Sequence, residues 1–324
     1  MHEVREQAAR WLERGDRVAL ATVVATRRSA PRPVGSKLIV SEQGELFGSV
    51  SGGCVESDVA VQAAEVLASG EPRLLSYGIT DDQAWEVGLP CGGEIDVFVQ
   101  PLAELPADGD GVLLTRLEGD RPGQTELVDR DAVEPGPSRV LELEGERVFA
   151  EVLGPPLRLV IVGATDTAEA LCRLAGALGW RTVAVDPRPA LATEERLPSA
   201  GERVVAWPDE ALELLELDAD TAVIVLTHEE RLDVPALTAA LASDAFYVGA
   251  IGSRKTQAKR RERLLEEEVT EEALDRLSGP AGLDLGAQTP AETAVSILAE
   301  ILAVRAGRGG GRLRDRSGRI HATT

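Results

Sequence analysis

The sequence predicts an α/β protein of two domains, a C-terminal Rossmann-like domain with a parallel sheet and a smaller N-terminal α+β domain. Three observations lead to this prediction. The chain has 324 residues and is 44% hydrophobic, which is enough to bury two ordinary cores. Its second half alternates continuous apolar runs with helical patterns, as is typical of parallel sheets. Its first half contains shorter strand candidates separated by turn signals, which favours an α+β arrangement.

We assign residues 1–105 to the N-terminal domain. Apolar residues at helical spacing predict an opening helix from Val4 to Leu12. Turn signals then separate the strand candidates, and a loop over residues 27–33 contains two prolines and several arginines. The predicted strands cover residues 18–26, 37–40, 45–50, 73–77 and 95–99.

A glycine-rich string from Gly48 to Gly53 leads into Cys54, and a helical pattern follows. Because glycines permit sharp turns, we expect Cys54 in the first turn of a helix, where the helix dipole favours the thiolate. A thiolate is both a metal ligand and a nucleophile. Cys54 is therefore a candidate catalytic residue and metal ligand, and Ser51, Gly52 and Gly53 are candidates for the loop that holds a cofactor.

Cys91, in the similar string over residues 88–93, is the second catalytic candidate. Two such loops in one domain are harder to explain by packing than one. The open alternative is that both thiols are small buried hydrophobic groups, because free cysteine is among the most buried residue types. A disulfide is a third reading, although nothing in the sequence indicates an oxidising compartment. The remaining cysteine, Cys172, lies in a helical pattern and is predicted to belong to the core.

Two stretches carry less regular patterns. Residues 106–155 are interrupted by prolines, and only residues 140–152 resemble a hairpin, so we interpret this region as a connection with some β structure. Residues 307–324 contain three consecutive glycines and five arginines, which predicts a disordered basic tail.

Residues 156–306 form the predicted Rossmann-like domain. An apolar strand ends at Gly163, a helix follows, and the next strand ends at Asp186. In a dinucleotide-binding unit of this layout, the helix N-terminus meets the pyrophosphate and the acid meets the ribose. Thr165 holds the place of the second glycine of G-x-G-x-x-G, so retained and lost nucleotide binding both stay open. Asp186 favours NAD and Arg188 could accept the 2′-phosphate of NADP, which leaves that choice open too.

Two further groups follow predicted strands of this domain. His228 comes after the strand candidate over residues 222–226, where a pH-sensitive donor beside a ligand and a local cap are both open readings. Gly252, Ser253 and Arg254 begin a basic helix, whose N–H groups and cations could hold an anion. We interpret the other charges of that helix as solvated.

The net charge of -21 argues against binding to nucleic acid or anionic membranes, because the long-range field repels polyanions. No apolar run approaches the roughly 20 residues of a membrane span. The start of the sequence lacks the basic region and following apolar region of a secretion signal. We therefore expect a cytoplasmic protein.

Several motifs together resemble the XdhC/CoxI family, the xanthine dehydrogenase accessory factors. The motifs read SAPRPVGSK, GSVSGGCVE, GLPCGG, DPR, LTH, YVGAIGSR, GLDLGA and TPAE. They occur in order across both predicted domains, from about residue 10 to residue 305. The resemblance implies a maturation factor for molybdenum hydroxylases of the xanthine dehydrogenase or CO dehydrogenase type.

The resemblance also implies what such a factor does. It binds molybdenum cofactor, supports its sulfuration by a cysteine desulfurase partner, and hands it to the apo-enzyme, so it is a cofactor chaperone rather than a catalyst. The second domain of the family is Rossmann-like. Relatives commonly read Gly-Ala-Gly where this chain reads Gly163-Ala164-Thr165. We also expect a homo-oligomer.

Molybdenum cofactor has a dithiolene-bound metal and a phosphate-bearing pterin, so a carrier needs a soft group for the metal and donors for the phosphate. Cys54, with Cys91 as a neighbour, is the candidate for the metal or sulfur end. Arg28, Arg32 and Lys37 are candidates for the phosphate end, and the alternative for each is a solvated basic loop. Two rival functions stay open: an NAD(P)-dependent oxidoreductase, and a scaffold that docks desulfurase to apo-hydroxylase without holding cofactor.

Overall fold

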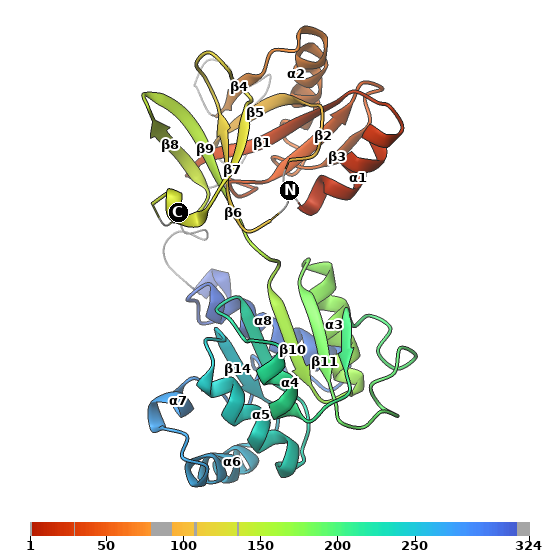
Figure 1. Ribbon diagram of the computed structural model, residues 1–324, viewed down its shortest axis with the longest axis vertical. Coiled ribbons are helices and arrows are strands. Elements are labelled where there is room, and N and C mark those ends of the chain that lie inside the picture. Colours follow the sequence, from red (N-terminus) through yellow and green to blue (C-terminus); the bar gives the residue numbers. More distant parts are fainter. Residues whose placement is uncertain (1, 29, 79–92, 107–108, 135, 316–324) are drawn as a thin grey trace. The chain divides into compact units, whose positions relative to one another are not determined.

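A computed structural model of the chain (Figure 1) describes residues 2–28, 30–78, 93–106, 109–134 and 136–315. The described residues form two compact units, with the boundary between Pro155 and Pro156. The first unit contains antiparallel sheets and the second a parallel sheet. The predicted fold class is therefore confirmed.

The N-terminal unit contains a five-stranded antiparallel sheet, here called sheet A, in the order β3-β2-β1-β5-β4. Its strands are β1 (Val18–Arg27), β2 (Lys37–Ser41), β3 (Leu46–Gly48), β4 (Arg73–Tyr77) and β5 (Glu94–Leu102). Two helices accompany it, α1 (His2–Glu13) and α2 (Glu56–Ser69). The central strand β1 pairs with β2 on one side and with β5 on the other.

The apolar sequence of β1 is buried on both faces of sheet A. Because side chains alternate across a strand, Ala19, Ala21 and Val23 share the face that packs against α2. Leu20 shares the opposite face and packs with residues of α1. Each fully buried Val or Leu contributes about 1.5–3 kcal/mol. Sheet A is thus a well-packed scaffold for the loops that leave its ends.

The stretch over residues 106–155 contains a complete four-stranded antiparallel sheet, here called sheet B, in the order β7-β6-β9-β8. The strands are β6 (Gly111–Arg116), β7 (Thr125–Val128), β8 (Arg139–Leu143) and β9 (Glu146–Leu153), with a short 3-10 turn η1 (Arg130–Ala132). Phe149 of β9 packs with Val24 and Phe98 of sheet A. This region is therefore part of the N-terminal core. The sequence had predicted only a connection with some β structure.

A buried ion pair also joins the two sheets. The Lys37 ammonium on β2 donates to the Glu151 carboxylate on β9 at 2.9 Å, and both side chains are almost entirely buried. Buried charges are costly unless they are paired. The pair therefore ties the register of sheet B to that of sheet A.

The C-terminal unit contains a six-stranded sheet in the order β12-β11-β10-β13-β14-β15, and every paired neighbour is parallel. This is the strand order of the dinucleotide-binding fold. The strands are β10 (Arg158–Val162), β11 (Arg181–Val185), β12 (Glu202–Val204), β13 (Thr221–Val225), β14 (Tyr247–Ala250) and β15 (Leu277–Ser278).

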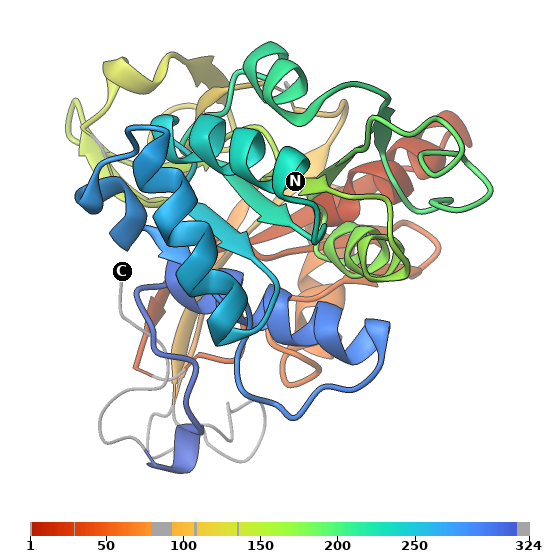
Figure 2. The same cartoon turned by 90° about the horizontal axis from the view of Figure 1, so that it is seen from below.

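Helices cover both faces of this parallel sheet (Figure 2). α3 and α8 pack on one face, while α4, α5, α6 and α7 pack on the other. Their bounds are α3 (Asp166–Ala177), α4 (Pro208–Leu214), α5 (Glu230–Ala242), α6 (Arg254–Glu266), α7 (Glu271–Asp275) and α8 (Pro290–Arg305). Of the stretch beyond residue 306 that was expected to be a disordered tail, the structure describes residues 307–315, which include the 3-10 turn η2 (Leu313–Asp315).

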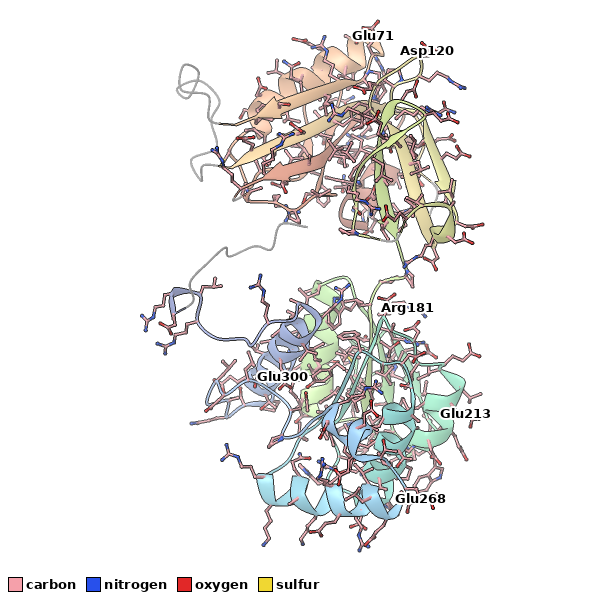
Figure 3. All side chains as sticks on the ribbon, turned by 90° about the vertical axis from the view of Figure 1, so that its left-hand side faces the viewer. Glu71, Asp120, Arg181, Glu213, Glu268 and Glu300 are labelled. Carbon is pink, nitrogen blue, oxygen red and sulfur yellow. The ribbon has the colours of Figure 1, made fainter. Side chains whose placement is uncertain are left out.

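α8 begins with a complete capping box and is anchored by a carboxylate near its other end. Thr289 accepts from the Glu292 N–H, and the Glu292 carboxylate accepts from the Thr289 N–H. Glu300, labelled in Figure 3, accepts from the buried Tyr247 hydroxyl of β14 at 2.6 Å and from the Gly282 N–H at 2.9 Å. Burial and the contact with Glu300 both raise the pKa of Tyr247. Among the described residues, no helix is long and apolar enough to cross a membrane.

Candidate functional site

Three connections leave sheet A at the same end. β1 ends at Arg27, opposite Glu94 at the start of β5, and β4 ends at Tyr77, opposite Ile95. β3 runs antiparallel to β2 and ends at Gly48, opposite Leu38 near the start of β2. The loops that follow β1 and β3 therefore begin at one end of the sheet, which is also where the chain leaves β4 and returns to β5.

Glu56 organises the loop that contains Cys54. Its carboxylate accepts hydrogen bonds from the hydroxyl and N–H of Ser51, the hydroxyl of Ser49, and the N–H groups of Val50 and Gly53. The Ser51 hydroxyl in turn accepts from the N–H groups of Cys54 and the residue after it, each at 2.9 Å. One side chain at the start of α2 thus fixes the backbone of the whole loop.

The pKa of Glu56 reflects these contacts. Partial burial raises it, but the hydrogen bonds from Ser51 and Ser49 outweigh burial and lower it from 4.5 to about 2. The carboxylate is therefore ionised throughout the neutral range. The first turn of α2 is also anchored at this end of sheet A, because Asp58 accepts from the Tyr77 hydroxyl at 2.7 Å.

Cys54 is exposed and lies in the loop before the helix. α2 begins at Glu56 with Val55 as its N-cap, so the expectation that Cys54 sits in the first helical turn was wrong. The physical reason is that the Cys54 N–H is bonded to Ser51, which keeps this residue in the turn. Gly52 and Gly53 have φ values of 74° and 106°, and a Cβ at either position would meet nothing within 4 Å. Space beside these two glycines is therefore open.

The other two cysteines differ from Cys54. Cys91 lies outside the described residues, so the structure does not place it. Cys172 is fully buried in α3, as its helical pattern predicts. Burial raises the pKa of the Cys172 thiol to about 11, despite a hydrogen bond with Thr182. Of the described cysteines, only Cys54 is accessible to a ligand.

The three cations proposed for the phosphate end lie in different surroundings. Arg28 follows β1 with φ at 61° and is mostly exposed, with Glu94 at 3.9 Å. Arg32 is partly buried in the loop between β1 and β2. Lys37 is occupied by the buried ion pair with Glu151. Arg28 and Arg32 therefore share a loop that begins at the same end of sheet A as the Cys54 loop, whereas Lys37 holds the two sheets together.

The glycine loop of the C-terminal unit shows why its sequence departs from the dinucleotide motif. Gly163 has φ at 108°, and an added Cβ would lie 2.6 Å from the Thr227 side chain. Thr165 is the N-cap of α3, and its hydroxyl accepts from the Ala168 N–H at 3.2 Å. The Thr165 hydroxyl thus accepts a hydrogen bond from a helix N–H group that could otherwise donate to a pyrophosphate.

Asp186, the candidate for the ribose, is fully buried. Its carboxylate accepts from the Ala164 N–H at 2.9 Å and from the backbone and guanidinium of Arg188 at 2.8–2.9 Å. Burial raises the pKa of Asp186, but the bonds from Arg188 outweigh it and lower the pKa below its ordinary value. The chain's own groups therefore occupy the Asp186 carboxylate and one N–H group at the N-terminus of α3, both of which lie where a dinucleotide binds in this fold.

Four other sequence candidates lie at strand ends of this unit. His228 is exposed after β13. Ser253 is the N-cap of α6, and its hydroxyl accepts from the Thr256 N–H at 3.1 Å. Gly252 has φ at 132°, and Arg254 is exposed at the first position of the helix. These residues are at least partly exposed at the surface.

A buried ionic network beside these strand ends was missed from the sequence. Asp233 of α5 accepts from Arg260 of α6 at 2.5 Å and from the Thr227 hydroxyl. Arg260 also donates to the Ile251 carbonyl at 3.2 Å, so the pair links the segments that follow β13 and β14. One signal was present: Arg260 lies four residues before the buried Leu264, on the same helix face.

Neither unit contains a preformed metal cage in the part that the structure describes, since no group of three or more His, Cys, Asp or Glu side chains could hold an ion. The arrangement of the N-terminal unit instead offers one exposed thiol on a fixed loop. A single soft ligand of this kind suits a metal centre that arrives with its own ligands.

Comparisons with known proteins match both units. Residues 159–301 match the model of the XdhC Rossmann domain, and residues 11–78 match the model of the XdhC and CoxI family. The molybdenum cofactor insertion chaperone PaoD of Escherichia coli (strain K12) is 32% identical over 300 residues, which cover 92% of this chain and 86% of that protein.

Two further relatives cover nearly the whole chain. A protein of Bacillus subtilis (strain 168) described as a probable xanthine dehydrogenase subunit is 26% identical, and the match covers 91% of this chain and 95% of that protein. A crystal structure described as a xanthine dehydrogenase from Bacillus halodurans has a TM-score of 0.76 at 26% identity, with 95% of this chain and 97% of that chain covered.

Proposed function

Because the chain belongs to the XdhC and CoxI family, we propose that it binds molybdenum cofactor and delivers it to a molybdenum hydroxylase apo-enzyme. The relative named as a molybdenum cofactor insertion chaperone supports this proposal, since it is similar over both units. In this function the cofactor is cargo, and the protein acts as a chaperone rather than as a catalyst.

The observation that carries the proposal is the exposed Cys54 thiol on a loop whose shape is fixed by Glu56. A carrier must hold its cargo firmly enough to protect it and weakly enough to release it. One thiolate contact to the metal or to its sulfur ligand, beside an open glycine surface, meets both demands. We assign Cys54 to the metal end of the cargo.

The phosphate end of the cargo needs cationic or N–H donors. Arg28 and Arg32 support this role, because their loop and the Cys54 loop leave sheet A at the same end. Lys37 is left out, because its ammonium already neutralises Glu151. In this proposal Cys91 contributes a second thiol to the metal end.

The proposal also covers the sulfuration of the cofactor, the client enzyme and the oligomeric state. We propose that a cysteine desulfurase docks on the protein and sulfurates the bound cofactor, and that the client is an enzyme of the xanthine dehydrogenase or CO dehydrogenase type. We also propose a cytoplasmic homo-oligomer. Delivery of the cofactor does not require NAD(P), and the chain's own groups hold the Asp186 carboxylate and the Thr165 hydroxyl.

The test is anaerobic retention of molybdenum cofactor, measured by the fluorescence of its oxidised pterin after gel filtration. We expect the wild type to retain the cofactor and Cys54→Ala to lose most of it. Cys172→Ala is the matched control, because it also removes one thiol but from the interior of α3. Cys91→Ala measures the contribution of the second thiol.

The outcomes separate the rival functions. Retention by neither wild type nor variants contradicts carriage and leaves the docking scaffold, which predicts that desulfurase binding survives Cys54→Ala. Equal retention by wild type and Cys54→Ala contradicts the role of the thiol. Saturable NAD(P) binding with turnover would support the oxidoreductase instead.

A further inference from the structure

Two arginine side chains, Arg188 and Arg231, both bind the carboxylate of Glu229, in the loops that follow strands β11 and β13. Glu229 accepts from Arg188 Nη1 at 2.7 Å through one oxygen and from Arg231 Nε at 2.9 Å through the other. Paired guanidinium groups converging on one anion are the arrangement by which proteins recognise phosphates and carboxylates. The anion in this case is supplied by the chain itself.

Arg188 is held rigidly for this contact. The fully buried Asp186 accepts from its Nε and Nη2, each at 2.8 Å, and from its backbone N–H at 2.9 Å. Burial of a carboxylate is unfavourable unless such partners compensate it. The paired atoms leave Nη1 as the guanidinium nitrogen directed to Glu229.

The side chain of Glu229 does not cap the helix that it precedes. It is the N-cap residue of α5, yet its side chain makes no capping hydrogen bond. Its carboxylate is bonded to the two arginines instead, and the side chain is 36% exposed. The carboxylate can therefore be exchanged for another anion without removing a helix cap.

The place of this cluster in the fold also points to a ligand. β10 lies between β11 and β13, and the chain order of the strands reverses there. Ligands of open parallel sheets bind outside the carboxyl ends of the strands at such a reversal. The guanidinium of Arg188 reaches from the end of β11 to Glu229 beyond the end of β13, across this point.

We propose that Arg188 and Arg231 form a clamp for the phosphate monoester of a ligand, and that Glu229 fills the clamp until the ligand displaces it. The charges of Asp186, Arg188, Glu229 and Arg231 cancel in the closed clamp, so displacement of Glu229 leaves one net positive charge for a phosphate dianion. The inference goes beyond the proposed function, in which Arg28 and Arg32 hold the phosphate of a cofactor bound through Cys54. The phosphate of molybdopterin is one group that the clamp could take. The 2′-phosphate of NADP has the same chemistry.

The test is calorimetric titration of the full-length protein with inorganic phosphate. Glu229→Gln keeps the shape of the side chain and removes the competing charge, so we expect phosphate to bind about tenfold more tightly than to wild type. Arg188→Met in the Glu229→Gln background removes that gain. Glu271→Gln is the matched control, because it removes one of the two carboxylates that pair with another half-exposed arginine, Arg261 of α6. No gain is expected there.

Equal phosphate affinity in wild type, Glu229→Gln and Glu271→Gln overturns the clamp, as does a gain that survives Arg188→Met. Titration of Glu229→Gln with molybdopterin, NADP and NAD then identifies the source of the phosphate. A gain for molybdopterin assigns the clamp to the pterin, and a gain for NADP without one for NAD assigns it to a nucleotide. Cofactor retention through Cys54 is measured separately, so the proposed function can hold when the clamp fails.

Discussion

Replacement of Glu56 by glutamine tests whether one carboxylate shapes the candidate cargo loop. The carboxylate accepts from Ser49, Ser51 and Gly53 through both oxygens. An amide nitrogen donates where one of those oxygens accepts, so at least one loop donor loses its partner. We expect Glu56→Gln to loosen the loop and to lower cofactor retention with Cys54 still present.

The expected cost follows from the pKa of Glu56. A shift from 4.5 to about 2 corresponds to about 3 kcal/mol at 1.36 kcal/mol per unit, and solvent screening of the partly exposed carboxylate reduces this to about 1–2 kcal/mol. The folded-state pKa is the lower one. The stabilisation is therefore complete above pH 4.5 and is lost as the pH falls from 4.5 towards 2.

Urea unfolding at several pH values measures this difference, and hydrogen exchange over α2 locates it. Glu65→Gln is the matched control, because Glu65 lies on the same helix in an exposed ion pair with Arg73. Such a pair contributes about 0–1 kcal/mol. A difference between Glu56→Gln and wild type that does not shrink as the pH falls below 4.5, or one no larger than for Glu65→Gln, would refute the reasoning.

Three further predictions concern other parts of the molecule. Gly163→Ala lowers the melting temperature, because the residue has φ at 108° and an added Cβ has a neighbour at 2.6 Å. Asp233→Leu lowers the free energy of unfolding in urea by about 3–5 kcal/mol, because it leaves the buried Arg260 unpaired. In a Cys91→Ser background, a maleimide labels Cys54 in the native protein and Cys172 only after unfolding, because burial raises the pKa of Cys172 to about 11.

Each of these predictions has its own control. Gly176→Ala, with nothing within 4 Å of the added Cβ, should not destabilise α3, and an equal loss at both glycines would remove the steric explanation. Adding Arg260→Met to Asp233→Leu should restore much of the stability, and no recovery would contradict the buried-pair account. Native labelling of Cys172 at the rate of Cys54 would be inconsistent with its burial.

The fold was predictable where local patterns decide it. The apolar strand over residues 158–162 and the helix after it follow from periodicity alone, and the parallel sheet follows from their alternation. Sheet B was not predictable in this way. Its strands β6 and β9 are separated in sequence by a stretch that contains several prolines, and its packing depends on Phe149 meeting residues of sheet A.

The chemistry of individual residues was less predictable than the fold. Lys37 and Arg260 have side chains that are usually solvated, and both are buried because a distant carboxylate pairs with them. Thr165 looked like a defect in a glycine motif, whereas it is an N-cap. Residue type indicates what a side chain can do, but tertiary partners decide what it does.

Because Lys37 pairs with Glu151, which is synthesised much later, the N-terminal unit cannot finish folding until most of its chain has been made. A fragment that ends at residue 105 contains the ammonium but lacks the carboxylate, and it also exposes the apolar surface that Phe149 covers. Such a fragment buries an uncompensated charge or opens the sheet to hydrate it. The smallest N-terminal piece with a finished interior therefore extends through β9, and the nascent chain reaches that state only when Glu151 has left the ribosome.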